Sequence, residues 1–259
     1  MLVAVNVFLL VLVSFREWKS VQYAEVARDE VVSILEKNGI RLDKSILPRD
    51  ADLRAMTVAR DVEAEARHAE ALLGPLDAAP GDSTAYRGEK GTAKFYLNGE
   101  FTAEFLPDAY PAGGPESAAL QLLAAMEFQG QVVESDAGSV TVRQTWEGAP
   151  IFNCEAVVTV QDGSLRAIRS GSRHLTGSPQ AEPGEAPMTV ATALMRFLDH
   201  IRSHGDICNG ITGFTAGYIL DSQSDPARLT PTWELTTDAG ADSNTYYINA
   251  LTGEIRSEA

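Results

Sequence analysis

The sequence has little cysteine, little histidine and few basic residues. Its 259 residues include 2 cysteines and 4 histidines, and 21 Lys and Arg stand against 36 Asp and Glu, for a formal net charge of −15. Without clustered cations, which displace counterions from phosphates, the chain has no basis for binding nucleic acid. Two cysteines are too few for a disulfide framework in a chain of this length. Cys154 and Cys208 are either buried small apolar residues, which we favour, or a single bridge in an oxidising compartment.

The chain also lacks the common catalytic and cofactor motifs. It contains no G-x-S-x-G and no protease signature around either cysteine. Gly210, Gly213 and Gly217 match neither G-x-G-x-x-G nor a P-loop, and they stand in an expected strand, where glycine marks a bulge or close sheet packing. We therefore predict no catalytic residue, no cofactor and no small-molecule substrate, and we expect that the protein is not an enzyme.

Histidine occurs in two constellations. His200 and His204 stand at i and i+4 on one expected helix face, with Asp206 and Cys208 just beyond, and this spacing can hold a soft divalent metal. No Glu follows the first His as in H-E-x-x-H, and His also suits the dipole of a solvated helix end, so no metal site is predicted. His174 follows two serines at an expected strand end, where a catalytic role is disfavoured.

Acidic and aromatic clusters are interpreted as structural. The segment 61–70 carries four acidic residues with Arg67 and His68, and it is expected to place them mostly on the solvated face of a helix rather than in a paired-carboxylate site. Trp146 and Trp233 each occur late in an expected strand. Core packing is the default for both, and contact with a partner is the alternative.

One apolar run lies at the N-terminus. Residues 1–13 are apolar except for Asn6, but a spanning helix needs about 20 apolar residues to cross a hydrocarbon core of about 30 Å. We interpret residues 1–19 as a transmembrane anchor that is truncated because its start codon is placed too late, with Trp18 at the outer interface. The alternative is a buried N-terminal helix of a soluble protein.

Helical periodicity predicts four further helices, each with a stop signal. They are expected over 20–38, ending at Asn38-Gly39; 61–73, ending at Gly74-Pro75; 115–129, ending at Gly130; and 189–204, ending at Gly205. Residues 40–60 are interpreted as an extended connector, in which 46–47 and 56–58 can pair locally. Residues 77–83 form an expected linker rich in Gly, Pro, Ser and Asp.

The clearest strand signal is a hairpin over residues 92–105. A loop formed by Leu97, Asn98 and Gly99 pairs Phe95 with Phe101 and separates apolar from polar side chains better than a two-residue loop does. It also places Gly99 at the left-handed position of a G1 bulge. Further strands are expected over 131–135, 139–146, 151–161, 164–174, 210–220, 230–237 and 245–248, with a short piece over 253–256.

The order of these elements predicts an α+β fold in which helices pack on antiparallel sheets. A helix followed by an antiparallel meander occurs twice, which indicates a duplicated unit. We divide the chain into the anchor (1–19), a juxtamembrane helix, connector and second helix (20–76), a first α+β unit with its hairpin (84–176) and a second α+β unit (188–259).

Four stretches, in this order, resemble the YycI family of two-component regulatory proteins. They are an apolar VNVFLLVLV run before a charged helix, EKNGIRLDKSILPRD over 36–50, YRGEKGTAKFYLNGEF over 86–101, and YYINALTGEI over 246–255. The last stretch, with Pro231, Thr232 and Trp233 upstream, also resembles the terminal strand and turn of PepSY-like domains.

The resemblance implies a single-pass protein in the cell membrane, with its N-terminus in the cytoplasm and most of the chain outside. In the family, the outer domain works with a YycH-like partner and a sensor histidine kinase of the WalK (YycG) type, and it thereby affects cell-wall metabolism. The expected function is regulation through protein–protein contacts. The alternative is a PepSY-type inhibitor or chaperone of a secreted hydrolase, which would act without the anchor.

Overall fold

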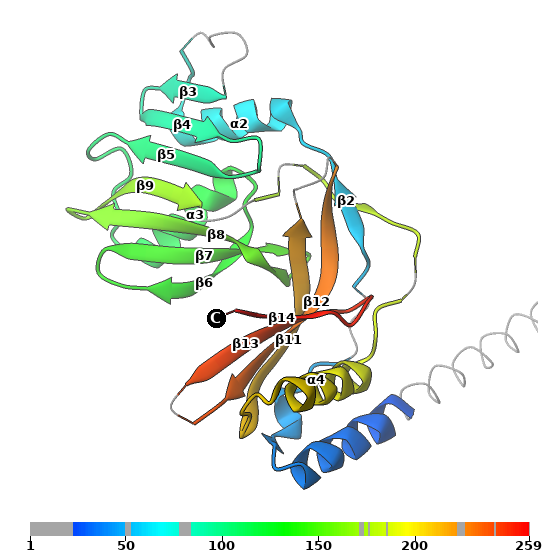
Figure 1. Ribbon diagram of the computed structural model, residues 1–259. Helices are drawn as coiled ribbons and strands as arrows, with labels where there is room; N and C mark the ends of the chain where they lie inside the picture. Colours follow the sequence, from blue (N-terminus) through cyan, green and yellow to red (C-terminus); the bar gives the residue numbers. More distant parts are fainter. Residues whose placement is uncertain are drawn as a thin grey trace, which may run out of the picture. The chain divides into compact units, whose positions relative to one another are not determined.

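The chain forms two compact units in the computed structural model (Figure 1), which describes residues 23–49, 53–77, 84–170, 174–175, 177–184, 186–221, 226–240 and 242–258. The first unit comprises 1–52, 186–215 and 233–259, and the second comprises 53–185 and 216–232. Strands β11 (Gly210–Asp221) and β12 (Ala227–Asp238) contribute residues to both units. The predicted α+β class is confirmed.

The second unit contains an antiparallel sheet in the order β3-β4-β5-β9-β8-β7-β6 (Figure 1). Along β4 and β5, buried and exposed residues alternate, so one sheet face is apolar. The strands are β3 (Ala85–Gly88), β4 (Gly91–Phe95), β5 (Phe101–Phe105), β6 (Gly130–Ser135), β7 (Ser139–Trp146), β8 (Ala149–Gln161) and β9 (Ser164–Ser170).

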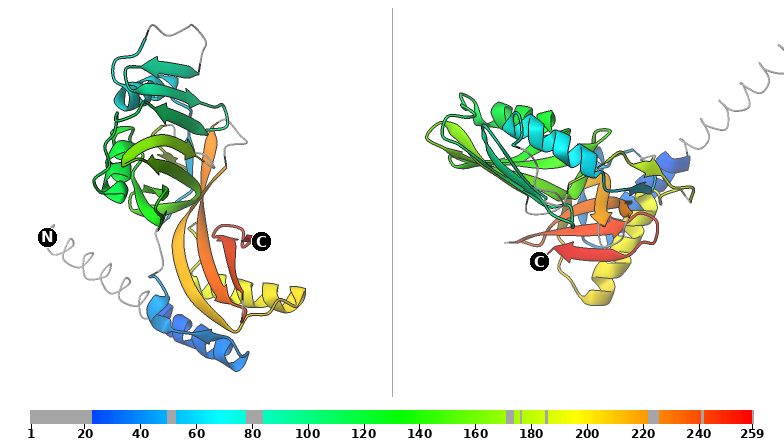
Figure 2. Two further views of the ribbon diagram at one scale, coloured as in Figure 1. Left: turned by 90° about the vertical axis from the view of Figure 1, so that its left-hand side faces the viewer. Right: turned by 90° about the horizontal axis from the view of Figure 1, so that it is seen from above.

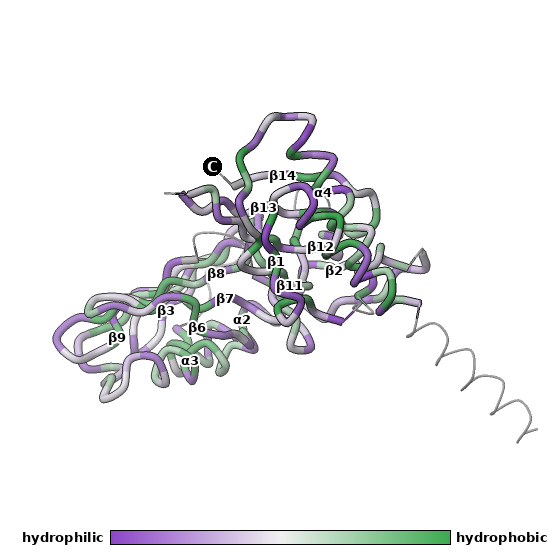
Figure 3. Tube along the Cα trace, turned by 90° about the horizontal axis from the view of Figure 1, so that it is seen from below, coloured by the Kyte–Doolittle hydropathy of each residue, from purple (hydrophilic) through white to green (hydrophobic). Residues whose placement is uncertain are grey.

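Two helices of the second unit, α2 (Val62–Leu73) and α3 (Pro115–Ala125), cover one face of this sheet (Figure 2). Much of α3 is apolar (Figure 3), which suits a helix packed against both a sheet and a neighbouring helix. The core between helices and sheet is rich in aromatic and aliphatic side chains, among them Leu72, Leu73, Phe95, Phe101, Phe105, Leu122, Leu123, Phe128 and Ile168.

Short strands add further pairings to the second unit. Strand β2 (Met56–Val58) pairs antiparallel with β10 (Gln180–Ala181) and with residues 227–229 of β12. The expectation that 56–58 pairs locally is therefore wrong, because its partners lie more than a hundred residues away. Tyr218 of β11 pairs in parallel with Ile151 of β8, so the sheet is mixed rather than purely antiparallel as expected.

The first unit combines two helices with three strands of its own and with the residues of β11 and β12 that belong to it. Helix α4 (Val190–His204) is capped at its N-terminus by Thr189, whose side chain accepts a hydrogen bond from Thr192 N. Gly205, in the left-handed conformation, ends the helix as predicted. Its Phe197 ring lies 5.1 Å from the Tyr246 ring. The other elements are a helix over 23–37, β1 (Arg41–Leu42), a 3₁₀ turn (Lys44–Ile46), β13 (Ser243–Asn249) and β14 (Ile255–Glu258).

The hairpin register is confirmed. Phe95 pairs with Phe101 and Ala93 with Ala103, and Tyr96 N donates to Glu100 O at 2.8 Å. Gly99 N donates to Tyr96 O at 3.0 Å, and Gly99 has φ +84°, which places it at the left-handed position of the bulge.

The predicted end of the helix over 115–129 is wrong. The helix ends at Ala125, and Glu127 rather than Gly130 takes the positive φ. Gly130 instead begins β6, where an added Cβ would come within 2.7 Å of Arg143 O. The glycine therefore permits close strand pairing rather than a helix stop.

Within the described residues, no helix is both long enough and apolar enough to span a membrane. The expected anchor over 1–19, the linker residues 78–83 and residues 171–173 before His174 lie outside the described part of the chain.

Candidate functional site

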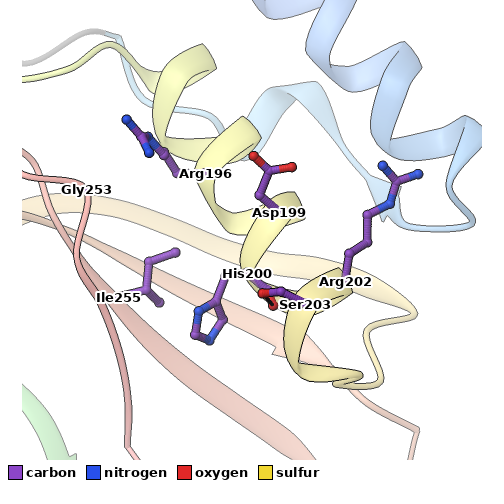
Figure 4. Close-up of a pocket in the computed structure, with 7 residues that line it drawn as sticks. All are labelled: Arg196, Asp199, His200, Arg202, Ser203, Gly253 and Ile255. Atoms are coloured by element: carbon purple, nitrogen blue, oxygen red, sulfur yellow. Dashed lines mark hydrogen bonds between the residues drawn. The ribbon is translucent and has the colours of Figure 1, made fainter.

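A shallow hollow beside α4 is lined by His200, one of the two histidines whose spacing in the sequence could suit a metal ion (Figure 4). Arg196, Asp199 and Arg202 point away from His200, so the polar groups do not converge on one point. The residues that line the hollow are Arg196, Asp199, His200, Arg202, Ser203, Gly253 and Ile255.

The candidate metal-ligand set forms the C-terminal end of α4. The His200 and His204 rings stack at 4.1 Å, and His200 Nε2 lies 3.9 Å from Asp206 Oδ2. Partial burial, with His204 nearby, lowers the pKa of His200. Cys208 Sγ donates to Gly210 O at 3.6 Å, and burial raises the pKa of this thiol. Among the described residues, no three His, Cys, Asp or Glu side chains gather as a metal site would require.

A second cavity, of about 460 Å³, lies within the second unit. We call it the His68 cavity. Its walls come from α2, the turn after α3, the β7–β8 turn and the residues Leu175, Gly177 and Ser178. The lining residues are Asp61, Ala64, Arg67, His68, Glu127, Gln129, Gln144, Thr145, Trp146, Glu147, Gly148, Leu175, Gly177 and Ser178.

Two polar side chains of α2, Glu65 and His68, are buried and are exceptions to the expected solvated face of segment 61–70. Glu65 is 1% exposed and accepts two hydrogen bonds from Arg60, at 2.7 and 2.8 Å. His68 is 5% exposed, and its Nε2 lies 3.5 Å from Glu127 Oε2. Its Nδ1 is buried without a hydrogen-bond partner among the described residues. Glu63 and Glu70 are exposed, as expected.

The rim of the His68 cavity carries two glutamates in an uncommon backbone conformation. Glu127 has φ +61° and Glu147 has φ +50°, a region that non-glycine residues rarely adopt. Gln144, which lines the same cavity, is buried and accepts a hydrogen bond from Leu175 N at 2.9 Å. Trp146 is partly buried, packs against the apolar cluster that includes Leu175 and also lines the cavity.

His174 has a structural position. Its Nδ1 lies 2.6 Å from Gly99 O, and its ring lies 4.6 Å from the Phe101 ring. Burial lowers its pKa to about 4, against the opposing effect of the Gly99 hydrogen bond. Its Nε2 has no partner among the described residues. The imidazole therefore stays neutral at physiological pH and belongs to the core.

The remaining residues singled out in the sequence are mostly packing residues. Trp233 is 1% exposed and stacks on Phe214 at 5.3 Å. An added Cβ at Gly217 would come within 2.4 Å of Pro150 O, so this glycine permits close sheet packing, as expected. Cys154 is buried and Cys208 half-buried, and both are thiols.

Comparison with known proteins gives no family. No family model matches the chain, and no curated protein matches it. A similar solved structure is the YpeB C-terminal domain of Bacillus megaterium, with 12% identity and a TM-score of 0.40 over 78% of this chain and 99% of that domain. This level of similarity supports no conclusion about family or activity, so the resemblance to the YycI family stays a prediction.

Proposed function

We propose that this chain is the extracytoplasmic part of a membrane-anchored, non-enzymatic regulatory protein. It acts through protein–protein contacts on a cell-envelope sensor histidine kinase, together with a YycH-like partner. The order of the four YycI-like stretches motivates the proposal. The observation that carries it is that helix 23–37, which follows the expected anchor, is bound by hydrogen bonds to other segments of the first unit, of which it is a part (Figure 1).

The C-terminal end of helix 23–37 is held by a Schellman motif. Ile40 N donates to Leu35 O at 3.0 Å and Gly39 N donates to Glu36 O at 2.9 Å, with Gly39 at φ +80°. Leu35 and Ile40 are both buried, which supplies the apolar contact that accompanies this motif. The helix end is therefore defined by its backbone as well as by packing.

Side chains join the same helix to other parts of the first unit. Arg28 donates to Leu47 O at 2.7 Å and also to Pro48 O. Asn38 accepts a hydrogen bond from Arg202 of α4. These contacts fix both the middle and the end of the helix, so a displacement of its N-terminus is transmitted to the folded unit rather than absorbed by a linker.

The N-terminal turn of the helix carries exposed apolar side chains. Tyr23 is 73% exposed and Val26 is 59% exposed. In the proposed mechanism, the anchor packs beside the transmembrane helices of the kinase, and Tyr23 and Val26 contact the partner just outside the membrane. The contacts shift the populations of kinase states, and because the tether raises the effective concentration they can be weak individually.

The test is a membrane pull-down with identification of the co-purifying proteins by mass spectrometry. The full chain is compared with a form that begins at Ser20, and Tyr23→Ser/Val26→Ser is compared with the control Val62→Ser, which changes an equally exposed valine of α2. We expect to recover the kinase and a YycH-like protein with the full chain and with Val62→Ser. Less of both should be recovered with the form that begins at Ser20 and with Tyr23→Ser/Val26→Ser.

Recovery of a secreted hydrolase with the full chain and with the Ser20 form would instead support the inhibitor alternative. Equal recovery of the kinase with both forms would contradict the role of the anchor.

A further inference from the structure

We propose that the His68 cavity binds an organic cation, either an alkylammonium or a guanidinium group. The cavity lies entirely within the second unit, and its lining combines carboxylates, an indole ring and buried polar side chains. The chemistry of this lining favours a positively charged organic group over an anion, a neutral ligand or a metal ion.

The charge balance of the lining is negative. Asp61, Glu127 and Glu147 stand against the single guanidinium of Arg67. Arg67 Nη2 lies 3.9 Å from Asp61 Oδ2, so these two charges largely compensate each other. Neither glutamate forms an ion pair with Lys or Arg among the described residues, and both are exposed, the side chain of Glu127 by 76%, so an incoming cation can reach either carboxylate.

His68 lies beside the carboxylate of Glu127. Its Nε2 lies 3.5 Å from Glu127 Oε2, at the limit of a hydrogen bond, while the imidazole is almost fully buried in the wall of the cavity. The Nδ1 atom has no hydrogen-bond partner among the described residues; the same holds for Nε2 of the core residue His174, but His68, unlike His174, lines the cavity. This buried, incompletely paired side chain indicates a wall built for a ligand.

The indole of Trp146 selects an organic cation rather than a metal ion. An ammonium or guanidinium group is attracted by an indole face, whereas the ring offers no ligand atom to a hard metal ion. The two glutamates come from separate turns, after α3 and between β7 and β8, on the same cavity.

The glutamates can be neutralised without disturbing the fold. Both have positive φ, and asparagine adopts this conformation more readily than glutamate does. Glu127→Asn and Glu147→Asn should therefore fold at least as well as the parent chain. Asp162→Asn is the matched control, because Asp162 also has positive φ, at φ +52°, but does not line the cavity.

The experiment follows the indole N–H signal of Trp146 by NMR in the full chain, held in detergent micelles and assigned with Trp146→Phe. The probes are the N-acetyl methylamides of lysine and arginine, the diamine putrescine, and the neutral citrulline analogue as a control. We expect saturable shifts with the cationic probes at millimolar concentration, and a loss of affinity of at least about fivefold in each glutamate variant, with Asp162→Asn unchanged.

If putrescine binds as tightly as the amino-acid amides, the site is assigned to free amines. If the amides bind more tightly than putrescine, the site is assigned to a basic side chain of a polypeptide. Absence of a saturable shift, equal shifts with citrulline, or unchanged affinity in both glutamate variants would overturn the proposal. Because the probes require neither the anchor nor a kinase, failure here leaves the proposed function untouched.

Discussion

His174 is a titratable group whose burial makes the stability of the protein depend on pH. Its pKa is lowered from 6.5 to about 4 by burial, so the folded chain resists a proton that the unfolded chain accepts readily. As the pH falls below 6.5, unfolding is coupled to proton uptake, and stability decreases until the pH reaches about 4. The contribution is fully present above pH 6.5.

Between pH 7.5 and pH 5, we predict that the free energy of unfolding of the parent chain falls by roughly 2 kcal/mol more than that of His174→Gln. The glutamine lacks the titration but keeps an N–H donor for Gly99 O. Urea titrations of both proteins at the two pH values measure the free energies of unfolding. Because both proteins share the same carboxylates, their contribution cancels when the two pH dependences are subtracted. Identical pH dependence in the two proteins would show that His174 does not resist protonation.

Glu65 and Glu63 of α2 provide a matched pair that separates a buried from an exposed carboxylate. Glu65→Gln removes the charge that compensates the partly buried Arg60, and we predict a loss of roughly 2–4 kcal/mol in the free energy of unfolding. Glu63→Gln, on the exposed face of the same helix, should leave stability almost unchanged. Chemical denaturation of both variants is the measurement, and equal effects would contradict the burial of Glu65.

At the scale of elements, the β7–β8 turn contains a residue that does not suit its conformation. Glu147 and Gly148 both have positive φ and connect the paired residues Trp146 and Ala149, as in a type I′ turn. Asparagine is favoured at the first of these positions. We predict that Glu147→Asn raises the thermal midpoint and stabilises the chain by up to about 1 kcal/mol.

Asp162→Asn is again the control, because Asp162 and Gly163 already form the Asp-Gly version of the same turn between β8 and β9. It should change stability little. A lower midpoint for Glu147→Asn would mean that the carboxylate makes a stabilising contact that outweighs its backbone strain.

Elements with local signals could be predicted from the sequence. The end of α4 follows from Gly205, and the register of the β4–β5 hairpin follows from the alternation of apolar residues around Gly99. In both cases the information lies within a few residues. By contrast, β1, β2 and β10 are two or three residues long and pair with partners far away in the chain, for which no local turn signal exists.

The His68 cavity was missed because its residues come from separate parts of the sequence. In α2, acidic residues and alanines alternate, and this pattern hides the burial of Glu65 and His68. The one available signal was Glu147-Gly148, whose two residues form a type I′-like turn directly after Trp146, the residue that ends the expected strand 139–146. The meeting of this turn with the end of α3 depends on tertiary structure alone.

At the scale of the whole molecule, the second unit is discontinuous in the sequence. Residues 216–232 return to it after a segment that belongs to the first unit. They supply Tyr218, which pairs with Ile151, and residues 227–229, which pair with β2. A cluster of buried side chains depends on this return: Met56, Val58, Ile151, Cys154, Leu175, Tyr218, Leu220 and Leu229.

We therefore predict that a fragment of residues 53–185 folds only in part. Its antiparallel sheet from β3 to β9 should keep slow amide exchange, because all of its antiparallel pairings lie within the fragment and only the parallel pairing of Ile151 with Tyr218 is lost. The β2 amides should exchange faster than in the whole chain, since the fragment keeps the partner strand β10 but lacks β12 and three buried residues of the cluster. Adding residues 216–232 as a peptide should restore protection at β2. Hydrogen exchange with mass spectrometry tests this, and full protection of Met56–Val58 in the fragment alone would show that the returning segment is dispensable for folding.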